Sequence, residues 1–113
     1  MSGIREFGYR VPRFHADFYF LLQTEGPGSR LMEARCLDIG EEGMAAEISE
    51  PLSVGTKVIM ILTLPGISTS LRVAARVCNR HDHEHGLAFV FASQNERRNF
   101  KEYLSTLHLQ PRS

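Results

Sequence analysis

The chain has 113 residues, and its 13 lysine and arginine residues balance its 13 aspartate and glutamate residues. A chain of this length forms one domain and can bury a substantial hydrophobic core. Zero formal net charge gives no overall field that would attract a nucleic acid polymer or an acidic membrane. No apolar run approaches the ~18 residues that a membrane span needs, so we expect no membrane insertion. Any anion-binding site must therefore come from a local cluster of side chains.

Residues 1–12 are polar, include glycine and proline, and show no hydrophobic period, which predicts a flexible basic leader. This segment lacks the apolar core of a secretion signal. The two cysteines, Cys36 and Cys78, lie in strand-like segments. We interpret each as a buried small hydrophobe in a reducing cytosol, in preference to half of a disulfide. The sequence therefore predicts a cytoplasmic protein.

Apolar and polar residues alternate in short runs from residue 13 onward, which predicts a series of strands. Glycine and proline separate these runs, as is usual for turns. The predicted strands cover about residues 13–22, 30–37, 44–48, 57–64, 71–77 and 87–91. Short strands at this spacing, without helices between them, favour a small antiparallel barrel over the parallel nucleotide-binding folds.

The hydrophobic period changes to that of a helix after the last strand. Ser93 and Glu96 match a capping box, in which a hydroxyl and a carboxylate each accept a backbone hydrogen bond. The apolar residues that follow at helical spacing are Phe100, Tyr103, Leu104 and Leu107. We expect an amphipathic helix over about 94–107. The predicted fold is mainly β, a six-stranded antiparallel β-barrel with a C-terminal α-helix over 13–110 and a tail over 111–113.

Two arginines, Arg10 and Arg13, flank a Val-Pro pair at the end of the leader. Proline favours extended chain at its own position and at the residue before it, so the two side chains would point to opposite sides. Guanidinium groups bind phosphate through paired hydrogen bonds and can pair with the O6 and N7 atoms of guanine. These residues could reach around an anionic ligand, or they could form an ordinary solvated segment.

The segment Asp38-Ile-Gly-Glu-Glu-Gly43 predicts a tight turn between two strands. A carboxylate at its entrance could accept hydrogen bonds from the N1 and N2 donors of guanine, and glycines let a ring approach the backbone closely. In the alternative interpretation, Asp38 caps its own turn and Gly43 supplies a positive φ. Together, the turn and the arginines suggest a guanine-nucleotide ligand.

The combination of these two segments resembles the PilZ domain family, bacterial receptors for the second messenger cyclic di-GMP. The resemblance extends over about residues 10–107. It also includes the segments 52–58, 62–65, 75–77 and 86–89. It implies a six-stranded antiparallel barrel with a C-terminal helix, with cyclic di-GMP as a regulatory ligand and with neither an enzymatic activity nor a cofactor.

The ligand signature of the family is an Arg-x-x-x-Arg leader with an Asp/Asn-x-Ser-x-x-Gly turn. Arg13 matches the second arginine, and Asp38 and Gly43 match the turn. Tyr9 stands in place of the first arginine, with an arginine beside it, and Gly40 stands in place of the serine. The resemblance therefore implies a cyclic di-GMP site made of Tyr9, Arg10, Arg13, Asp38, Gly40 and Gly43.

Two functions follow from these residues. As a receptor, the domain would draw its leader onto the barrel when the dianionic ligand binds, and a protein effector would sense the altered surface. As an adaptor, it would keep the barrel for protein interaction after losing the ligand, which the departures at Tyr9 and Gly40 favour. In either case the barrel could also form a homodimer.

Three histidines, His81, His83 and His85, alternate before the last strand. On a strand they would present three imidazoles on one face, and imidazole binds zinc, copper and nickel. We favour the alternative, in which they are polar residues of a solvated hairpin tip, and we expect no metal site.

Overall fold

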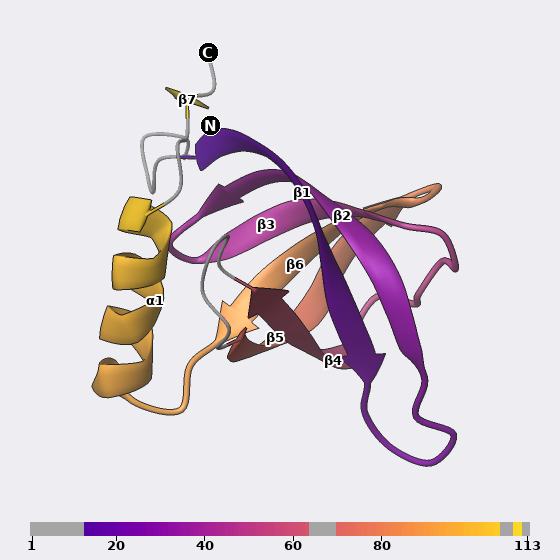
Figure 1. The fold of residues 1–113 in the computed structure, drawn as a ribbon. Helices are drawn as coiled ribbons and strands as arrows, with labels where there is room; N and C mark the ends of the chain where they lie inside the picture. The colour runs from indigo at the N-terminus through magenta and orange to yellow at the C-terminus, as the bar shows by residue number, and fades with distance from the viewer. Residues whose placement is uncertain (1–12, 64–69, 107–109, 112–113) are drawn as a thin grey trace, which may run out of the picture.

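The computed structural model describes residues 13–63, 70–106 and 110–111. Figure 1 shows the ribbon. The strands are β1 (Arg13–Thr24), β2 (Leu31–Gly40), β3 (Gly43–Ile48), β4 (Lys57–Thr63), β5 (Ser70–His81), β6 (Glu84–Val90) and β7 (Gln110–Pro111), and the helix is α1 (Gln94–Thr106). The predicted leader at residues 1–12 lies outside the described residues.

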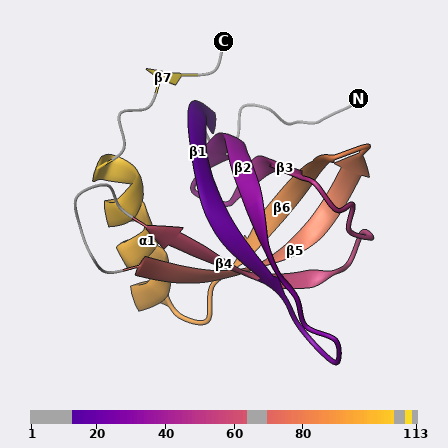
Figure 2. The same ribbon diagram turned by 45° about the vertical axis from the view of Figure 1, so that its right-hand side comes forward.

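Six of the strands form a closed antiparallel barrel. Their order is β2-β3-β6-β5-β4-β1, and β1 also pairs with β2, which joins the two ends of the sheet. Figure 2 shows β1 and β2 running together along one side of this barrel. The predicted fold is confirmed. The short strand β7, which pairs with Phe14 and His15 of β1, was not predicted.

The barrel interior holds the apolar residues of the predicted alternation. Alternate positions of each strand point inward, so that one face of every strand is buried and the other meets solvent. The fully buried large side chains include Leu22, Ile39, Met44, Ile48, Met60, Leu62, Val73, Val77 and Leu87. Burial of these side chains is the main source of the stability of the barrel.

The helix α1 covers one end of the barrel. Phe100 is fully buried, and its ring centroid lies 4.6 Å from that of Phe89 and 5.5 Å from that of Phe91. The predicted cap is present, because the Ser93 hydroxyl accepts a hydrogen bond from the Glu96 amide at 3.1 Å. The Glu96 carboxylate accepts from the Ala92 amide, one residue earlier than in the standard box. Of the helices in the described residues, none is long and apolar enough to cross a membrane.

The strand β2 is longer than predicted and contains Asp38. The sequence placed Asp38 at the entrance of a turn, whereas β2 continues to Gly40 and only Glu41 and Glu42 connect it to β3. The register between β2 and β3 shifts between Cys36 and Asp38, where β2 has an extra residue. Such a bulge interrupts the period of two on which a strand prediction depends, which explains the early end of the predicted strand.

The two cysteines have different environments, and both are free thiols. Cys36 is buried, as predicted. Burial, together with the nearby charge of Asp38, raises the pKa of the Cys36 thiol to about 12, so it stays protonated at neutral pH. The prediction was wrong for Cys78, which is exposed. Cys78 occupies a bulge of β5, and its thiol donates to the carbonyl of Gly86 at 3.3 Å.

The three histidines do not share one environment. His81 is exposed and His83 lies in the turn between β5 and β6, as predicted for a hairpin tip. The prediction of a solvated hairpin tip was wrong for His85, which lies in β6 and is fully buried. Its Nε2 atom accepts a hydrogen bond from the Leu52 amide at 2.9 Å, and its Nδ1 atom lies 2.8 Å from the His83 carbonyl oxygen. A neutral imidazole protonated on Nδ1 satisfies both contacts and ties the segment before β4 to β6.

Replacement of His85 by alanine should lower the free energy of unfolding by about 2–4 kcal/mol, because it leaves the Leu52 amide without its acceptor and opens a cavity. Denaturant unfolding measures this change. His81→Ala is the matched control on the same hairpin, and it should change stability little because His81 is exposed.

The same histidine predicts a pH dependence. Burial lowers the pKa of His85 below its ordinary value of 6.5. The unfolded chain therefore binds the proton more tightly, and the stabilisation that is complete above about pH 6.5 is lost as the pH falls toward the folded-state pKa. Unfolding curves at about pH 7.5 and about pH 5.5 should show a smaller loss in His85→Ala than in the wild type. An equal loss in both would contradict this assignment.

Candidate ligand-binding site

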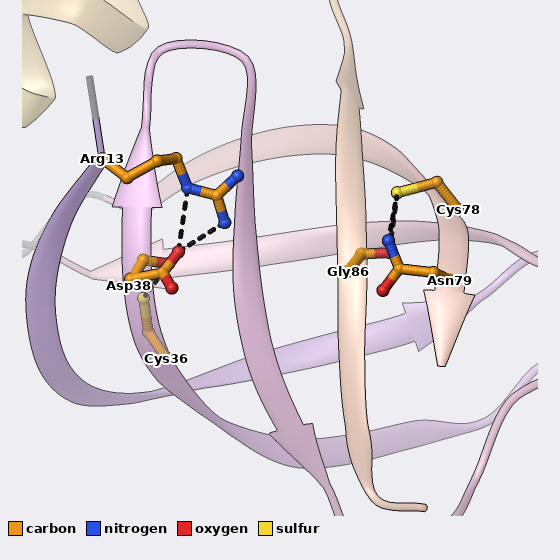
Figure 3. A network of polar contacts seen from close by, with 6 residues as sticks. All are labelled: Arg13, Cys36, Asp38, Cys78, Asn79 and Gly86. Carbon is orange, nitrogen blue, oxygen red and sulfur yellow. Dashed lines mark hydrogen bonds and ion pairs between the residues drawn. The ribbon is translucent and has the colours of Figure 1, made fainter. Parts of the chain in front are cut away.

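The register of β1 against β2 brings Arg13 to Asp38. Arg13 lies opposite Gly40, and His15 lies opposite Asp38. The Arg13 side chain crosses diagonally to the carboxylate, where Nε donates to Oδ1 of Asp38 at 2.9 Å and Nη2 donates to the same oxygen (Figure 3). Two residues that are 25 positions apart in the sequence therefore form one ion pair on the outer face of the barrel.

The two partners of this ion pair differ in exposure. Asp38 is only 3% exposed, whereas 41% of the Arg13 side chain is exposed. A carboxylate at such a depth is costly unless hydrogen-bond donors compensate for the lost water, and Arg13 supplies two of them. The other terminal nitrogen, Nη1, lies on the side of the guanidinium away from Asp38 (Figure 3). The pair thus fixes a cation that remains partly exposed to solvent.

The turn that follows β2 requires glycine at position 43 for a steric reason. A Cβ atom on Gly43 would lie 2.5 Å from the carbonyl oxygen of Leu87 in the neighbouring strand. Gly43 is not among the glycines with positive φ, so the interpretation that it supplies a left-handed turn residue was wrong. The Phe89 amide also donates to the Glu42 carbonyl at 2.9 Å, which holds the turn against β6.

The helix also contacts this turn. The Nζ atom of Lys101 lies 3.9 Å from the Oε1 atom of Glu41. Both side chains are about half exposed, so this ion pair contributes little stability by itself. The contact shows that the turn lies beside α1 at one end of the barrel.

Of the predicted site residues, the structure brings together Arg13 and Asp38, with Gly40 paired to Arg13 in the sheet and Gly43 at the start of β3. Tyr9 and Arg10 lie outside the described residues. His15 was missed by the sequence analysis. It is exposed, it lies opposite Asp38, and its position two residues after Arg13 in a strand places both side chains on one face. That spacing was the available signal.

A metal site is not formed by the three alternating histidines. The described residues, which include all three, contain no group of three or more histidine, cysteine, aspartate or glutamate residues that could hold a metal ion. The hairpin explains the difference: His81 ends β5 and His85 lies in β6 beyond the turn, so His85 is buried whereas His81 is exposed to solvent.

Comparisons with known proteins agree with this architecture. The family model of the PilZ domain matches residues 10–106. Among solved structures, the PilZ domain of CeSA from a cellulose-synthesizing bacterium superposes with a TM-score of 0.70 at 19% identity, covering 82% of this chain and 94% of that chain. The inhibitor of motility MotI/DgrA of Bacillus subtilis superposes with a TM-score of 0.58 at 13% identity, covering 87% of this chain and 50% of that chain. No curated protein sequence matches significantly.

Replacement of Gly43 by alanine should destabilise the barrel by about 1–3 kcal/mol, because the new methyl group meets a backbone oxygen that cannot move independently of β6. Thermal unfolding without any ligand measures this effect. A stability equal to that of the wild type would show that the strands can separate enough to accept the methyl group, and would leave no packing reason for glycine here.

Replacement of Arg13 by alanine should cost about 1–3 kcal/mol of stability, because the carboxylate of Asp38 loses two donors at a site that is almost closed to water. Arg35→Ala is the matched control on the same pair of strands. Its partner Asp17 has a 69% exposed side chain, so the loss should be clearly smaller than that of Arg13→Ala. Equal losses for the two variants in denaturant unfolding would contradict the importance of burial.

Proposed function

The chain belongs to the PilZ domain family, and on that premise we propose that it is a receptor that binds cyclic di-GMP through Arg13 and the neighbouring turn without breaking a bond of the ligand. PilZ domains are regulatory binding domains. The observation that carries the proposal is the ion pair that holds Arg13 at the barrel surface beside Asp38. In this role the protein acts in the cytoplasm, where the messenger would reach it.

Arg13 is the anion-binding residue in this proposal. Its guanidinium is already held through Nε and Nη2, so a phosphate can bind at the outer edge without first immobilising a free side chain. Asp38 then acts by positioning Arg13. Direct acceptance of a guanine edge by Asp38 requires displacement of Arg13, because the carboxylate is 3% exposed and faces that side chain. Gly40 and Gly43 keep the adjoining backbone free of side chains.

The leader supplies the remaining contacts. Arg10 would take the second phosphate or stack on a guanine, and Tyr9 would add an aromatic surface for a base. Binding of the dianion would bring the leader onto the outer face of the barrel beside His15 and Asp38. A protein effector could then recognise the surface that the leader and the ligand form together.

The departures from the family signature set the expected affinity. Gly40 lacks the hydroxyl of the usual serine, which removes a hydrogen bond worth on the order of 1 kcal/mol. Tyr9 in place of arginine removes a charge-assisted contact worth about 1.5–3 kcal/mol, or roughly 10- to 100-fold in affinity. Arg10 can recover part of this loss, so we expect binding in the micromolar range.

The second candidate function is a protein-interaction adaptor that does not bind the ligand. Tyr9 and Gly40 favour it, because each removes a ligand contact. The structural similarity to MotI/DgrA adds support, since that protein is an inhibitor of motility. In this case the ion pair of Arg13 and Asp38 would serve only to stabilise the barrel.

Calorimetric titration with cyclic di-GMP separates the two candidates. A saturable isotherm with a midpoint in the micromolar range or tighter, lost in Arg13→Ala, supports the receptor. Arg35→Ala serves as the control, because it removes an arginine from the same two strands outside the proposed site. Circular dichroism must show that both variants are folded. Absence of heat at about 100 μM ligand would exclude useful binding and support the adaptor.

A further inference from the structure

We propose that the outer face of the β1–β2 hairpin docks a lysine- or arginine-bearing segment of a partner protein. This hairpin face comprises Tyr19, Leu21, Leu31, Glu33 and Arg35, together with Glu47 of the adjoining β3. The inference rests on the proposed function in one respect, since it names the chemistry of the effector. The surface itself is defined by described residues and needs no dinucleotide.

Exposed apolar side chains gather on the hairpin face. Tyr19 is 66% exposed, Leu21 is 42% exposed and Leu31 is 60% exposed, and these are three of the five exposed large hydrophobic residues in the described part of the chain. The strand register places Tyr19 opposite Arg35 and Leu21 opposite Glu33. An apolar cluster framed by charged residues is typical of protein-binding surfaces, and tyrosine is enriched among their strongest contacts.

A groove adjoins these side chains. Its volume is about 410 Å³. Its lining includes Tyr19, Glu33, Arg35, Glu47, Ser49 and His83. This volume is at the low end of the range for small-molecule sites, so the groove can hold one or two side chains of a partner. The apolar residues beside it can then cover the rest of the docked segment.

The groove and its edges carry more negative than positive charge. Glu33 and Glu47 line it, and Asp17 and Glu84 lie beside them in the sheet. The guanidinium of Arg35 is shared between two carboxylates, because Nε and Nη2 donate to Asp17 at 2.8 and 3.1 Å and Nη1 lies 3.9 Å from Oε1 of Glu47. This single cation stands against the four carboxylates of Asp17, Glu33, Glu47 and Glu84. Glu47 also lies directly opposite Glu84 in the register of β3 and β6. Like charges in that position destabilise a sheet, and a cation from outside would relieve the repulsion.

Charge selects the occupant. The excess of carboxylates repels a dianionic dinucleotide, so the groove is distinct from the site at Arg13 and Asp38. It attracts lysine and arginine side chains, which can also lie over the exposed ring of Tyr19 in a cation–π contact. A partner segment with one or two basic residues next to apolar residues fits both parts of the hairpin face.

The test uses the full chain, without cyclic di-GMP, and an acetylated tri-arginine amide as the probe. Amide shifts in a nitrogen-15 correlation spectrum should saturate at Tyr19, Arg35, Ser49 and His83. The double variant Glu33→Gln/Glu47→Gln should weaken binding about two- to thirtyfold, the range expected for the loss of two exposed charge contacts. The control Glu42→Gln/Glu102→Gln removes two exposed carboxylates outside the hairpin face, one in the turn between β2 and β3 and one in α1, and should change binding less than about twofold. Tyr19→Ala should also weaken binding, while its spectrum should remain that of a folded protein.

Shifts on another face, or equal weakening by the two double variants, would overturn the proposal. Concentration-dependent sedimentation of the protein alone, with shifts at both the groove and the basic residues Arg97, Arg98 and Lys101 of α1, would assign the groove to a second copy and would overturn it as well. Because no dinucleotide is present, failure here leaves the calorimetric test of the receptor untouched. Failure of that titration likewise leaves this test valid.

Discussion

Closure of the barrel through β1 is the constraint from which both the core and the candidate site follow. One edge of β1 pairs with β2 and the other with β4, so the sheet has no free end at this point. The register that joins β1 to β2 also sets Arg13 opposite Gly40, and this places its side chain beside Asp38. A shift of one residue would turn the buried face of β1 to solvent, so the core fixes the position of the site.

The buried carboxylate links stability to binding. Asp38 lies at a depth where its charge must be compensated, and Arg13 provides the compensation from a more exposed position. The arginine is thereby held in place before a ligand arrives, which reduces the entropy lost on binding. The same contact limits the ligand, because a phosphate that pulled Arg13 away would leave Asp38 without two donors. A productive anion must therefore bind at the outer edge of the guanidinium.

The sequence predicted the barrel well because most strands keep a strict alternation, and it predicted the helix start because a capping box depends on local residues. Errors occurred where tertiary contacts override local patterns. The bulge at Cys36–Asp38 shifts the alternation, so β2 was ended too early. Cys78 was assigned to the interior because cysteine is usually buried, although it directly follows the inward-facing Val77 and therefore lies on the outward face of β5. Histidine is a common residue in polar loops, but His85 is buried because its imidazole accepts a hydrogen bond from the amide of Leu52, which is distant in the sequence. The contact of Arg13 with Asp38 could be inferred only through the family resemblance.

The zero net charge of the chain conceals a separation of charge along the outer face of β1 and β2. Arg13 provides positive charge at one end, and the carboxylates around Arg35 provide negative charge farther along. Arg35 lies three positions before Asp38 in β2, at most about 10 Å along the strand, which is close to the Debye length at 0.1 M salt. A dianionic ligand beside Arg13 would make the potential at the hairpin face more negative and favour a cationic partner there. Linkage makes this coupling reciprocal, so the partner would strengthen ligand binding equally. Salt would weaken this electrostatic coupling, whereas coupling through the leader would be lost on deletion of residues 1–12, and the two routes can be distinguished on that basis.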